Sequence, residues 1–267
     1  MGTLQGRRAL VTGSIQGIGL GVARALAAEG ASVVLHGLAT PEQVAAAEAE
    51  VLAAGAASVE SHTSDLRDPA ATEQLVEGLL ASGPIDILVN NAGIQFTAPL
   101  ASMPRSKWDD ILAINLSAAF DTMRLLLPGM AERGFGRVVN IASVHGLVAS
   151  VEKAPYVSAK FGLVGLTKVA ALEYAAVGDA STGGVTVNAI APGWVETPLI
   201  EPQIQLRAER HGGDRALGVA DLLSEKQPSR RLSTTDDIGR LAAWLCDPRA
   251  HNVTGTVIPV DGGWTAQ

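Results

Sequence analysis

Short apolar runs alternate with longer segments of helical period along the whole chain. The apolar runs, rich in Val, Ile and Leu, are expected to be strands and cover residues 8–13, 32–37, 58–63, 85–93, 136–143, 184–193 and 255–263. Between them lie Ala- and Leu-rich stretches of helical pattern, such as PEQVAAAEAEVLAAG. Strands that are apolar on both faces and alternate with helices are typical of a parallel sheet covered on both sides. The pattern therefore predicts a doubly wound α/β fold with seven strands, built as a single domain over residues 1–267.

One segment departs from this alternation. From Ile200 to Pro228 the chain is polar and mixed in charge, and the next helical pattern, TTDDIGRLAAWL, follows only after it. A connection of this length inside a compact domain is usually functional. The glycine pair Gly212 and Gly213 lies in the middle of it and predicts a hinge between two short helices. We therefore expect residues 198–228 to form a helical lid over a substrate site.

Composition narrows the class of protein. The chain is 47% hydrophobic and 18% charged, which favours a large buried core. Its net charge of -7 and the lack of a Lys/Arg-rich run predict that nucleic acid is not a partner. The single cysteine, Cys246, indicates a reducing compartment, so we expect a cytoplasmic protein. No signal-peptide pattern and no membrane span of about 18 apolar residues are expected from the sequence.

The first predicted strand runs directly into a glycine-rich turn. The stretch TGSIQGIGLGVARALAAEG places Gly13, Gly17 and Gly19 between the strand and a helix. Glycine allows the backbone to approach a pyrophosphate closely, and the free N–H groups of the helix N-terminus attract its negative charge. Such turns often serve only to pack a helix on a sheet, but the strand–turn–helix context favours dinucleotide binding.

The ends of the next strands indicate which dinucleotide binds. The second strand ends in LHGLATPEQ, which offers neither an acid for the ribose hydroxyls nor an arginine for a 2′-phosphate, so NAD is favoured. Asp65, after the third strand, has two interpretations: it accepts a hydrogen bond from the adenine amino group, or it caps the following helix, a position that Asp68 fits better. The motif NNAG ends the fourth strand, where ligands of such sheets collect.

Tyr156 and Lys160 are four residues apart in a predicted helix and so share one of its faces. An ammonium beside a phenol stabilises the phenolate, which predicts a Tyr156 pKa below the usual ~10 and a proton-transfer role during hydride movement. The alternative is an interfacial tyrosine with a snorkelling lysine. Ser143, at the end of the fifth strand, favours the proton-transfer role of Tyr156, because the serine hydroxyl can hold a substrate oxygen beside it. Asn115, a poor helix former in the middle of a predicted helix, can hold a water that supplies protons to the lysine.

The motifs TGSIQGIG, NNAG, YVSAK and PGWVETP, together with Asn115 and Ser143, resemble the short-chain dehydrogenase/reductase family over essentially the whole chain. The resemblance implies a Rossmann-type seven-stranded parallel sheet, a homotetramer, and a catalytic tetrad of Asn115, Ser143, Tyr156 and Lys160. Tyr156 would be the acid/base, and Lys160 would also bind the nicotinamide ribose. The implied cofactor site consists of Gly13, Ser14, Gln16, Gly17, Ile18, Asp65, Leu66, Asn91, Ala92, Gly93, Tyr156, Lys160, Pro192, Gly193, Val195 and Thr197.

Five further residues surround the expected position of the substrate: Gln95, His145, Lys153, Trp194 and Gln203. Amides, an imidazole and an ammonium around one carbonyl site predict recognition of a small carboxylate. Each residue also has a plain structural interpretation: Lys153 and Gln203 can be solvated, His145 can cap a turn, and Trp194 can wall the cofactor site.

Within the family, the motifs NNAGIQ, HGLVASVEK, EKQPS and DGGWTAQ resemble bacterial D-3-hydroxybutyrate dehydrogenases. This resemblance implies NAD-dependent interconversion of (R)-3-hydroxybutyrate and acetoacetate without a metal. It implies a substrate site of Gln95, Ser143, His145, Lys153, Tyr156, Trp194 and Gln203, with Lys153 on the carboxylate. Two alternatives stay open: a reductase of a 3-oxoacyl thioester or a sugar, and a non-catalytic dinucleotide-binding regulator.

Overall fold

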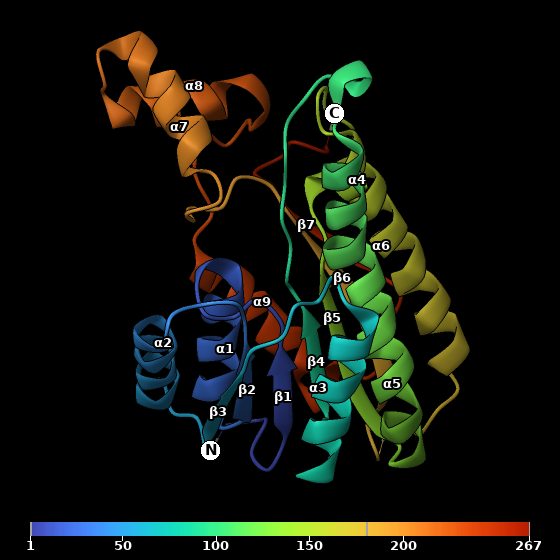
Figure 1. Cartoon of the computed structure of the whole chain (residues 1–267). Coiled ribbons are helices and arrows are strands. Elements are labelled where there is room, and N and C mark those ends of the chain that lie inside the picture. Colours follow the sequence, from blue (N-terminus) through green and yellow to red (C-terminus); the bar gives the residue numbers. More distant parts are fainter. Residues whose placement is uncertain (1, 180, 267) are drawn as a thin grey trace.

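A twisted parallel sheet forms the centre of the molecule, with helices on both faces (Figure 1). The computed structural model describes residues 2–179 and 181–266, so Met1, Ala180 and Gln267 of the expected domain lie outside the described part. The strands are β1 (Arg8–Val11), β2 (Ser32–His36), β3 (Val59–His62), β4 (Ile87–Asn90), β5 (Phe135–Ile141), β6 (Gly184–Pro192) and β7 (Val257–Val260). Their order is β3-β2-β1-β4-β5-β6-β7, and all pairs are parallel. The predicted seven-stranded fold is confirmed.

The helices are α1 (Gly17–Ala28), α2 (Pro41–Ala53), α3 (Pro69–Ala81), α4 (Arg105–Leu112), α5 (Ala118–Glu132), α6 (Ala154–Tyr174), α7 (Glu201–Ala208), α8 (Arg215–Lys226) and α9 (Thr235–Cys246). Two apolar clusters hold the layers together. One cluster joins the sheet to α1, α2 and α9, and the other joins it to α3, α5 and α6. In β2, Val33 and Leu35 belong to the first cluster and Val34 to the second. Because successive side chains of a strand point to opposite faces, a sheet covered on both sides needs such continuous apolar strands.

The strand order places the functional region. The chain moves outward from β1 to β2 and β3, then returns to add β4 on the other side of β1. The connections that follow β1 and β4 therefore leave in opposite directions and open a crevice at the carboxyl ends of these two strands. Ligands of open α/β sheets bind in such a crevice.

A continuous helical run, Arg105–Glu132, includes α4, a π-helical turn and α5. It is long and apolar enough to cross a membrane by length and composition alone, and 44% of its most apolar window is buried. Met123, Leu126 and Met130 of this run pack in the second core cluster. Its apolar composition is therefore accounted for by its position on the sheet.

Helices α7 and α8 stand apart from the sheet as a pair, at the upper left of Figure 1. Between them Gly212 and Gly213 have φ angles of 66° and 90°, values at which L side chains are strained. The prediction of two short helices joined at a glycine pair is thus confirmed. Buried Ile204 and Leu222 of this pair pack with Trp194 and Trp264, which connects the segment to the crevice below it.

Candidate active site

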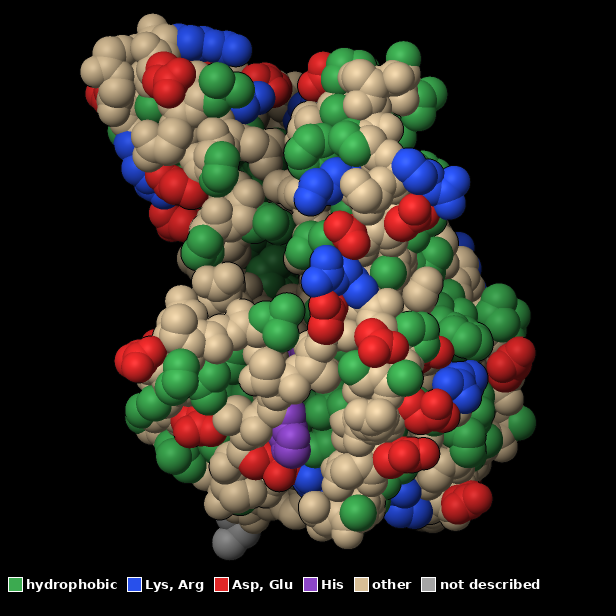
Figure 2. Space-filling view, viewed as in Figure 1, with side chains coloured by type: hydrophobic (Ala, Val, Ile, Leu, Met, Phe, Trp, Pro, Cys, Tyr) green, Lys and Arg blue, Asp and Glu red, His purple; other side chains and the backbone are tan. Residues whose placement is uncertain are grey.

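A cavity of about 870 Å³ runs along the carboxyl ends of the central strands and beneath α7. Figure 2 shows its mouth as a hollow between the pair α7 and α8 and the rest of the molecule. Fifteen of the sixteen expected cofactor residues line it: Gly13, Gln16, Gly17, Ile18, Asp65, Leu66, Asn91, Ala92, Gly93, Tyr156, Lys160, Pro192, Gly193, Val195 and Thr197. The fold thus gathers residues from widely separated motifs around one elongated space.

The glycine-rich turn forms one wall of this space. A Cβ at Gly13 would lie 2.8 Å from Ala92 Cα, and a Cβ at Gly19 would lie 2.3 Å from the Gly13 carbonyl oxygen. Helix α1 begins at Gly17, and Gln16 before it makes no side-chain capping hydrogen bond. The first N–H groups of α1 therefore have no side-chain partner at the cap, which fits the binding of a pyrophosphate.

Ser14 is the expected cofactor residue that does not line the cavity. Its hydroxyl donates to the Val11 carbonyl at 2.7 Å and accepts from the His36 N–H at 3.0 Å. Both bonds are internal, so the structure gives the Ser14 side chain a role in joining the turn to β2.

The far end of the cavity is lined by residues that follow β2, including His36, Gly37, Leu38 and Ala39. None of these is an acid or an arginine. Asp65 also lines this end, and its carboxylate accepts hydrogen bonds from the Arg67 guanidinium, which holds the Asp65 pKa at about 2. Asp65 is therefore an ionised acceptor near neutrality. The helix-cap alternative is excluded, because Asp68 accepts from Ala70 N–H at the start of α3.

Ser143, Tyr156 and Lys160 meet in the middle of the cavity. Ser143 follows β5 and accepts from the His145 backbone N–H at 3.2 Å. The Lys160 ammonium lies 5.6 Å from the centre of the Tyr156 ring and donates to the Ile141 carbonyl at 2.7 Å. The expected sharing of one helix face by Tyr156 and Lys160 is confirmed.

The predicted lowering of the Tyr156 pKa is wrong for the protein on its own. Burial raises the pKa of this phenol, because the phenolate loses hydration, and a hydrogen bond with Ser143 works against that effect. Lys160 does not reverse the balance, since its ammonium is directed to the Ile141 carbonyl and burial lowers its own pKa to about 8. Ser143, rather than Lys160, is the side chain that favours the phenolate here.

Asn115 lies beside the cavity rather than in its wall. It occupies the π-helical turn Ala113–Ser117, a rare distortion that is frequent at functional sites. Its side-chain oxygen accepts from the Ile94 N–H at 2.9 Å, and its amide nitrogen donates to the Ile94 carbonyl at 3.0 Å. Asn115 therefore holds the loop after β4 in place.

The expected substrate residues gather at the end of the cavity next to Tyr156. Gln95, His145, Lys153 and Trp194 all line it. The Lys153 ammonium is 3.5 Å from Gln95 Oε1 and 5.4 Å from the Trp194 ring centre. Burial, together with the positive charges of Lys226 and Arg207, lowers the Lys153 pKa to about 8. The solvated interpretation of Lys153 is wrong, since only 8% of this residue is exposed.

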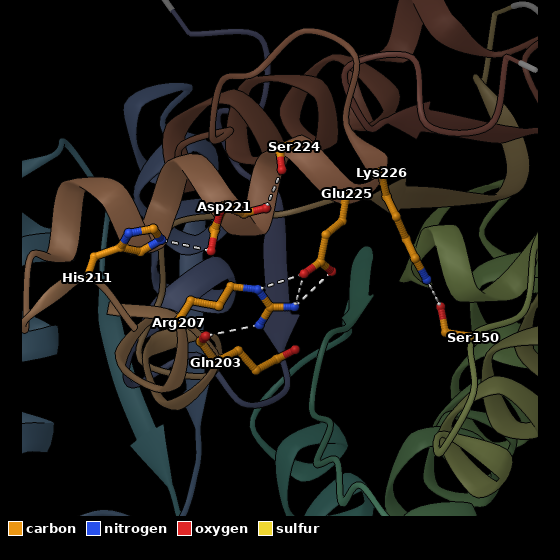
Figure 3. Close-up of polar contacts among 8 residues, drawn as sticks. All are labelled: Ser150, Gln203, Arg207, His211, Asp221, Ser224, Glu225 and Lys226. Atoms are coloured by element: carbon orange, nitrogen blue, oxygen red, sulfur yellow. Dashed lines mark hydrogen bonds and ion pairs between the residues drawn. The ribbon is translucent and has the colours of Figure 1, made fainter. Parts of the chain in front are cut away.

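Gln203 is not brought together with the others. It lies on α7 and does not line the cavity, and its backbone carbonyl accepts from Arg207 Nη1 at 3.1 Å (Figure 3). Sequence reasoning also missed Trp264, which lines the cavity and packs edge-on against His145 at 5.5 Å between ring centres. The motif DGGW could have indicated Trp264, because it follows the last strand, which ends at the same edge of the sheet as the other strands that border the cavity.

Comparison with known proteins identifies the family. A family model described as enoyl-(acyl carrier protein) reductase matches residues 13–265. The D-beta-hydroxybutyrate dehydrogenase of Cupriavidus necator is 47% identical over 266 residues, covering 99% of this chain and 100% of the relative. That of Rhizobium meliloti is 42% identical over 263 residues, covering 98% and 99%. This chain belongs to the short-chain dehydrogenase/reductase family.

Solved members of the short-chain dehydrogenase/reductase family share the whole architecture. The gluconate 5-dehydrogenase of Burkholderia cenocepacia, solved in complex with NADP and tartrate, superposes with a TM-score of 0.85 at 33% identity, covering 99% of this chain and 97% of that one. The family binds a nicotinamide dinucleotide, and the long cavity with its glycine turn and uncapped helix N-terminus fits one.

Proposed function

We propose that this short-chain dehydrogenase/reductase interconverts (R)-3-hydroxybutyrate and acetoacetate with NAD. The observation that carries the proposal is the buried Lys153 ammonium beside the Gln95 amide, in the same cavity as Ser143 and Tyr156. A buried cation with a neighbouring amide suits a carboxylate, which would place the other end of a short hydroxy acid at the serine and the tyrosine. The names of the two relatives at 47% and 42% identity support the same substrate.

The side chains divide the reaction between them. In oxidation, Tyr156 takes the proton of the substrate hydroxyl while Ser143 holds the same oxygen, and in reduction Tyr156 returns that proton. When bound, the dinucleotide would accept the hydride that leaves the carbinol carbon, and its positively charged nicotinamide ring would favour the phenolate. Lys160 would hold the nicotinamide ribose, and Asn115 would hold the loop after β4 in position.

NAD is favoured over NADP by the residues after β2. The adenosine end of the cavity is lined by Gly37, Leu38 and Ala39. Among the described residues, no arginine that could pair with a 2′-phosphate lines this end. Arg67, which follows the lining residues Asp65 and Leu66, is paired with Asp65 and with Asp110 at 3.6 Å.

The remaining features of the proposal concern the whole protein. We propose a single catalytic domain in which residues 198–228 act as a lid that brings Gln203 onto the substrate. The lone buried Cys246 supports a cytoplasmic enzyme, and a homotetramer is the expected assembly.

The alternatives have less support. A thioester reductase should present free cations for the phosphates of its carrier, whereas two of the three lid arginines are paired, Arg207 with Glu225 and Arg215 with Glu201. A non-catalytic regulator would not need Ser143, Tyr156 and Lys160 to line one cavity.

The proposal is tested by following NADH absorbance with a panel of small hydroxy acids, both enantiomers, and both nicotinamide cofactors. We expect (R)-3-hydroxybutyrate with NAD to be the preferred pair and Tyr156→Phe to remove turnover. Lys153→Ala should raise the KM for 3-hydroxybutyrate roughly tenfold or more, because a charge-assisted hydrogen bond to the carboxylate is lost. Lys107→Ala, at an exposed lysine of α4, is the control and should leave KM unchanged. An unchanged KM in Lys153→Ala contradicts the carboxylate assignment.

A further inference from the structure

A series of side-chain hydrogen bonds leads from the end of α8 to the catalytic serine. Lys226, in the last turn of α8, donates from Nζ to Ser150 Oγ at 2.7 Å (Figure 3). Ser150 Oγ is 2.8 Å from His145 Nε2, and His145 Nδ1 is 3.4 Å from Ser143 Oγ. Neither Lys226 nor Ser150 was expected as a site residue.

The donor and acceptor properties of these groups determine which group donates in each hydrogen bond of the series. An ammonium can only donate, so Ser150 Oγ accepts from Lys226 and can pass its own proton toward His145 Nε2. A positive charge on this side of the ring also favours the imidazole tautomer whose lone pair is on Nε2. The proton of that tautomer is on Nδ1, which faces Ser143 Oγ.

With this tautomer of His145, the hydroxyl of Ser143 can donate its proton only to the reacting oxygen or to Tyr156. Its oxygen faces two donors, the His145 backbone N–H at 3.2 Å and the protonated Nδ1. The Ser143 O–H is therefore free to donate to the oxygen of Tyr156 or of the substrate. In the opposite tautomer His145 Nδ1 would accept the Ser143 proton, and the serine could not donate to the reacting oxygen.

His145 is suited to this task because it stays neutral. Burial, with the charges of Lys153 and Lys226 nearby, lowers the His145 pKa to about 3. The ring is also fixed, since it packs edge-on against Tyr156 at 5.9 Å and against Trp264 at 5.5 Å between ring centres. Lys226 lies 5.4 Å from the centre of that same Trp264 ring.

The contact of Lys226 differs from the others drawn in Figure 3. Arg207 pairs with Glu225, and His211, in the turn between α7 and α8, pairs with Asp221, so these contacts stay within the segment from α7 to α8. Lys226 instead reaches Ser150, which lies on the loop between β5 and α6. Which atoms donate in the hydrogen bonds from Ser150 to Ser143 therefore depends on the position of the end of α8.

We propose that Lys226 is a positioning residue that, through Ser150 and His145, directs the proton of Ser143 toward the reacting oxygen. The position of the lid is thereby coupled to the hydrogen bonding of the catalytic serine. The inference rests on the proposed function in one respect only, that the reacting oxygen is held at Ser143.

The first test compares pH profiles of kcat for 3-hydroxybutyrate oxidation in Lys226→Met, Ser150→Ala and the double variant. Each should move the midpoint of the acid limb upward by about half a pH unit or more and lower kcat roughly threefold at pH 7, because the phenolate loses a donor. KM should change less than kcat. The double variant should show no further shift, since both changes interrupt one series. Ser150→Thr keeps the hydroxyl and should behave as the wild type.

Arg207→Met is the matched control, because it breaks an ion pair of the lid without touching the series. It should leave the midpoint in place. A midpoint that moves equally in this variant indicates a general effect of the lid and overturns the proposal. A shift in Lys226→Met without one in Ser150→Ala indicates a charge acting through space and overturns it too.

A second measurement needs no substrate. The ¹⁵N chemical shifts of the His145 ring, assigned by their loss in His145→Gln, should show a proton on Nδ1 in the wild type and a mixture of tautomers in Lys226→Met and Ser150→Ala. A wild-type ring protonated on Nε2 overturns the proposal. If 3-hydroxybutyrate is not oxidised, the proposed function fails while this measurement still decides the role of Lys226.

Discussion

At the scale of single residues, surroundings rather than sequence neighbours determine ionisation. Tyr156 and Lys160 are one helical turn apart, yet burial raises the pKa of the phenol and the lysine ammonium turns to the Ile141 carbonyl. Lys153, three residues before the tyrosine, has its pKa lowered to about 8 by burial and by other cations. At Tyr156 the loss of hydration therefore outweighs the opposing hydrogen bond with Ser143.

The lowered pKa of Lys153 predicts a pH effect on substrate binding. The ammonium is present below pH 8 and is lost as the pH rises through 8, so the KM for 3-hydroxybutyrate should increase about tenfold between pH 7 and pH 9. Steady-state kinetics across this range provide the measurement. Lys153→Arg keeps its charge at pH 9 and should flatten the increase. A flat wild-type profile would mean that the carboxylate is held by other groups.

At the scale of elements, close approach explains which glycines the site requires. Gly19, in the first turn of α1, lies against the turn of Gly13, and its missing Cβ leaves room for the Gly13 carbonyl and the Asn91 amide. Gly78, on the exposed side of α3, has no atom within 4 Å of where a Cβ would lie. The same residue type is therefore a packing requirement in one helix and a helix-weakening choice in another.

These two glycines give a matched pair of variants. Gly19→Ala should destabilise the protein by about 1–3 kcal/mol and weaken NADH binding, because the turn must move to admit the methyl group. Gly78→Ala should stabilise it by up to about 1 kcal/mol and leave binding unchanged. Denaturant unfolding and NADH fluorescence titration measure the two effects. Equal stability of both variants would show that the turn adapts without cost.

At the scale of the whole molecule, apolar side chains remain uncovered on two neighbouring helices. Phe120 of α5 is 47% exposed, and Phe161, Val169 and Leu172 of α6 are 46%, 52% and 80% exposed. An apolar surface spread over packed helices is typical of an interface between protein chains. It supports the proposed homotetramer, in which copies would meet through these helices.

The assembly is measured by light scattering after gel filtration, where we expect the mass of four chains of 27.4 kDa each. Combining Phe161→Glu with Leu172→Glu should dissociate the tetramer into smaller species, because charges cannot be buried unpaired in an interface. Leu52→Glu, at an exposed leucine of α2, is the control and should leave the mass unchanged. A monomeric wild type would contradict the assembly.

The sequence by itself determined the layers, the seven strands and the residue types of the site. Apolar runs, glycine turns and helical spacing are local, so the order of residues records them directly, and most of the expected cofactor residues line one cavity. Even the glycine pair between α7 and α8 was visible as a local break in the pattern.

Only the tertiary structure decided what those residues do to one another. The hydration that a side chain loses depends on every element packed around it. The direction of the Tyr156 pKa shift therefore could not be predicted from Lys160 alone. The contact between Lys226 and Ser150 joins positions 76 residues apart, and Gln203 is kept out of the cavity wall by the placement of α7. Such distances and directions arise from packing between elements, which no single stretch of sequence records.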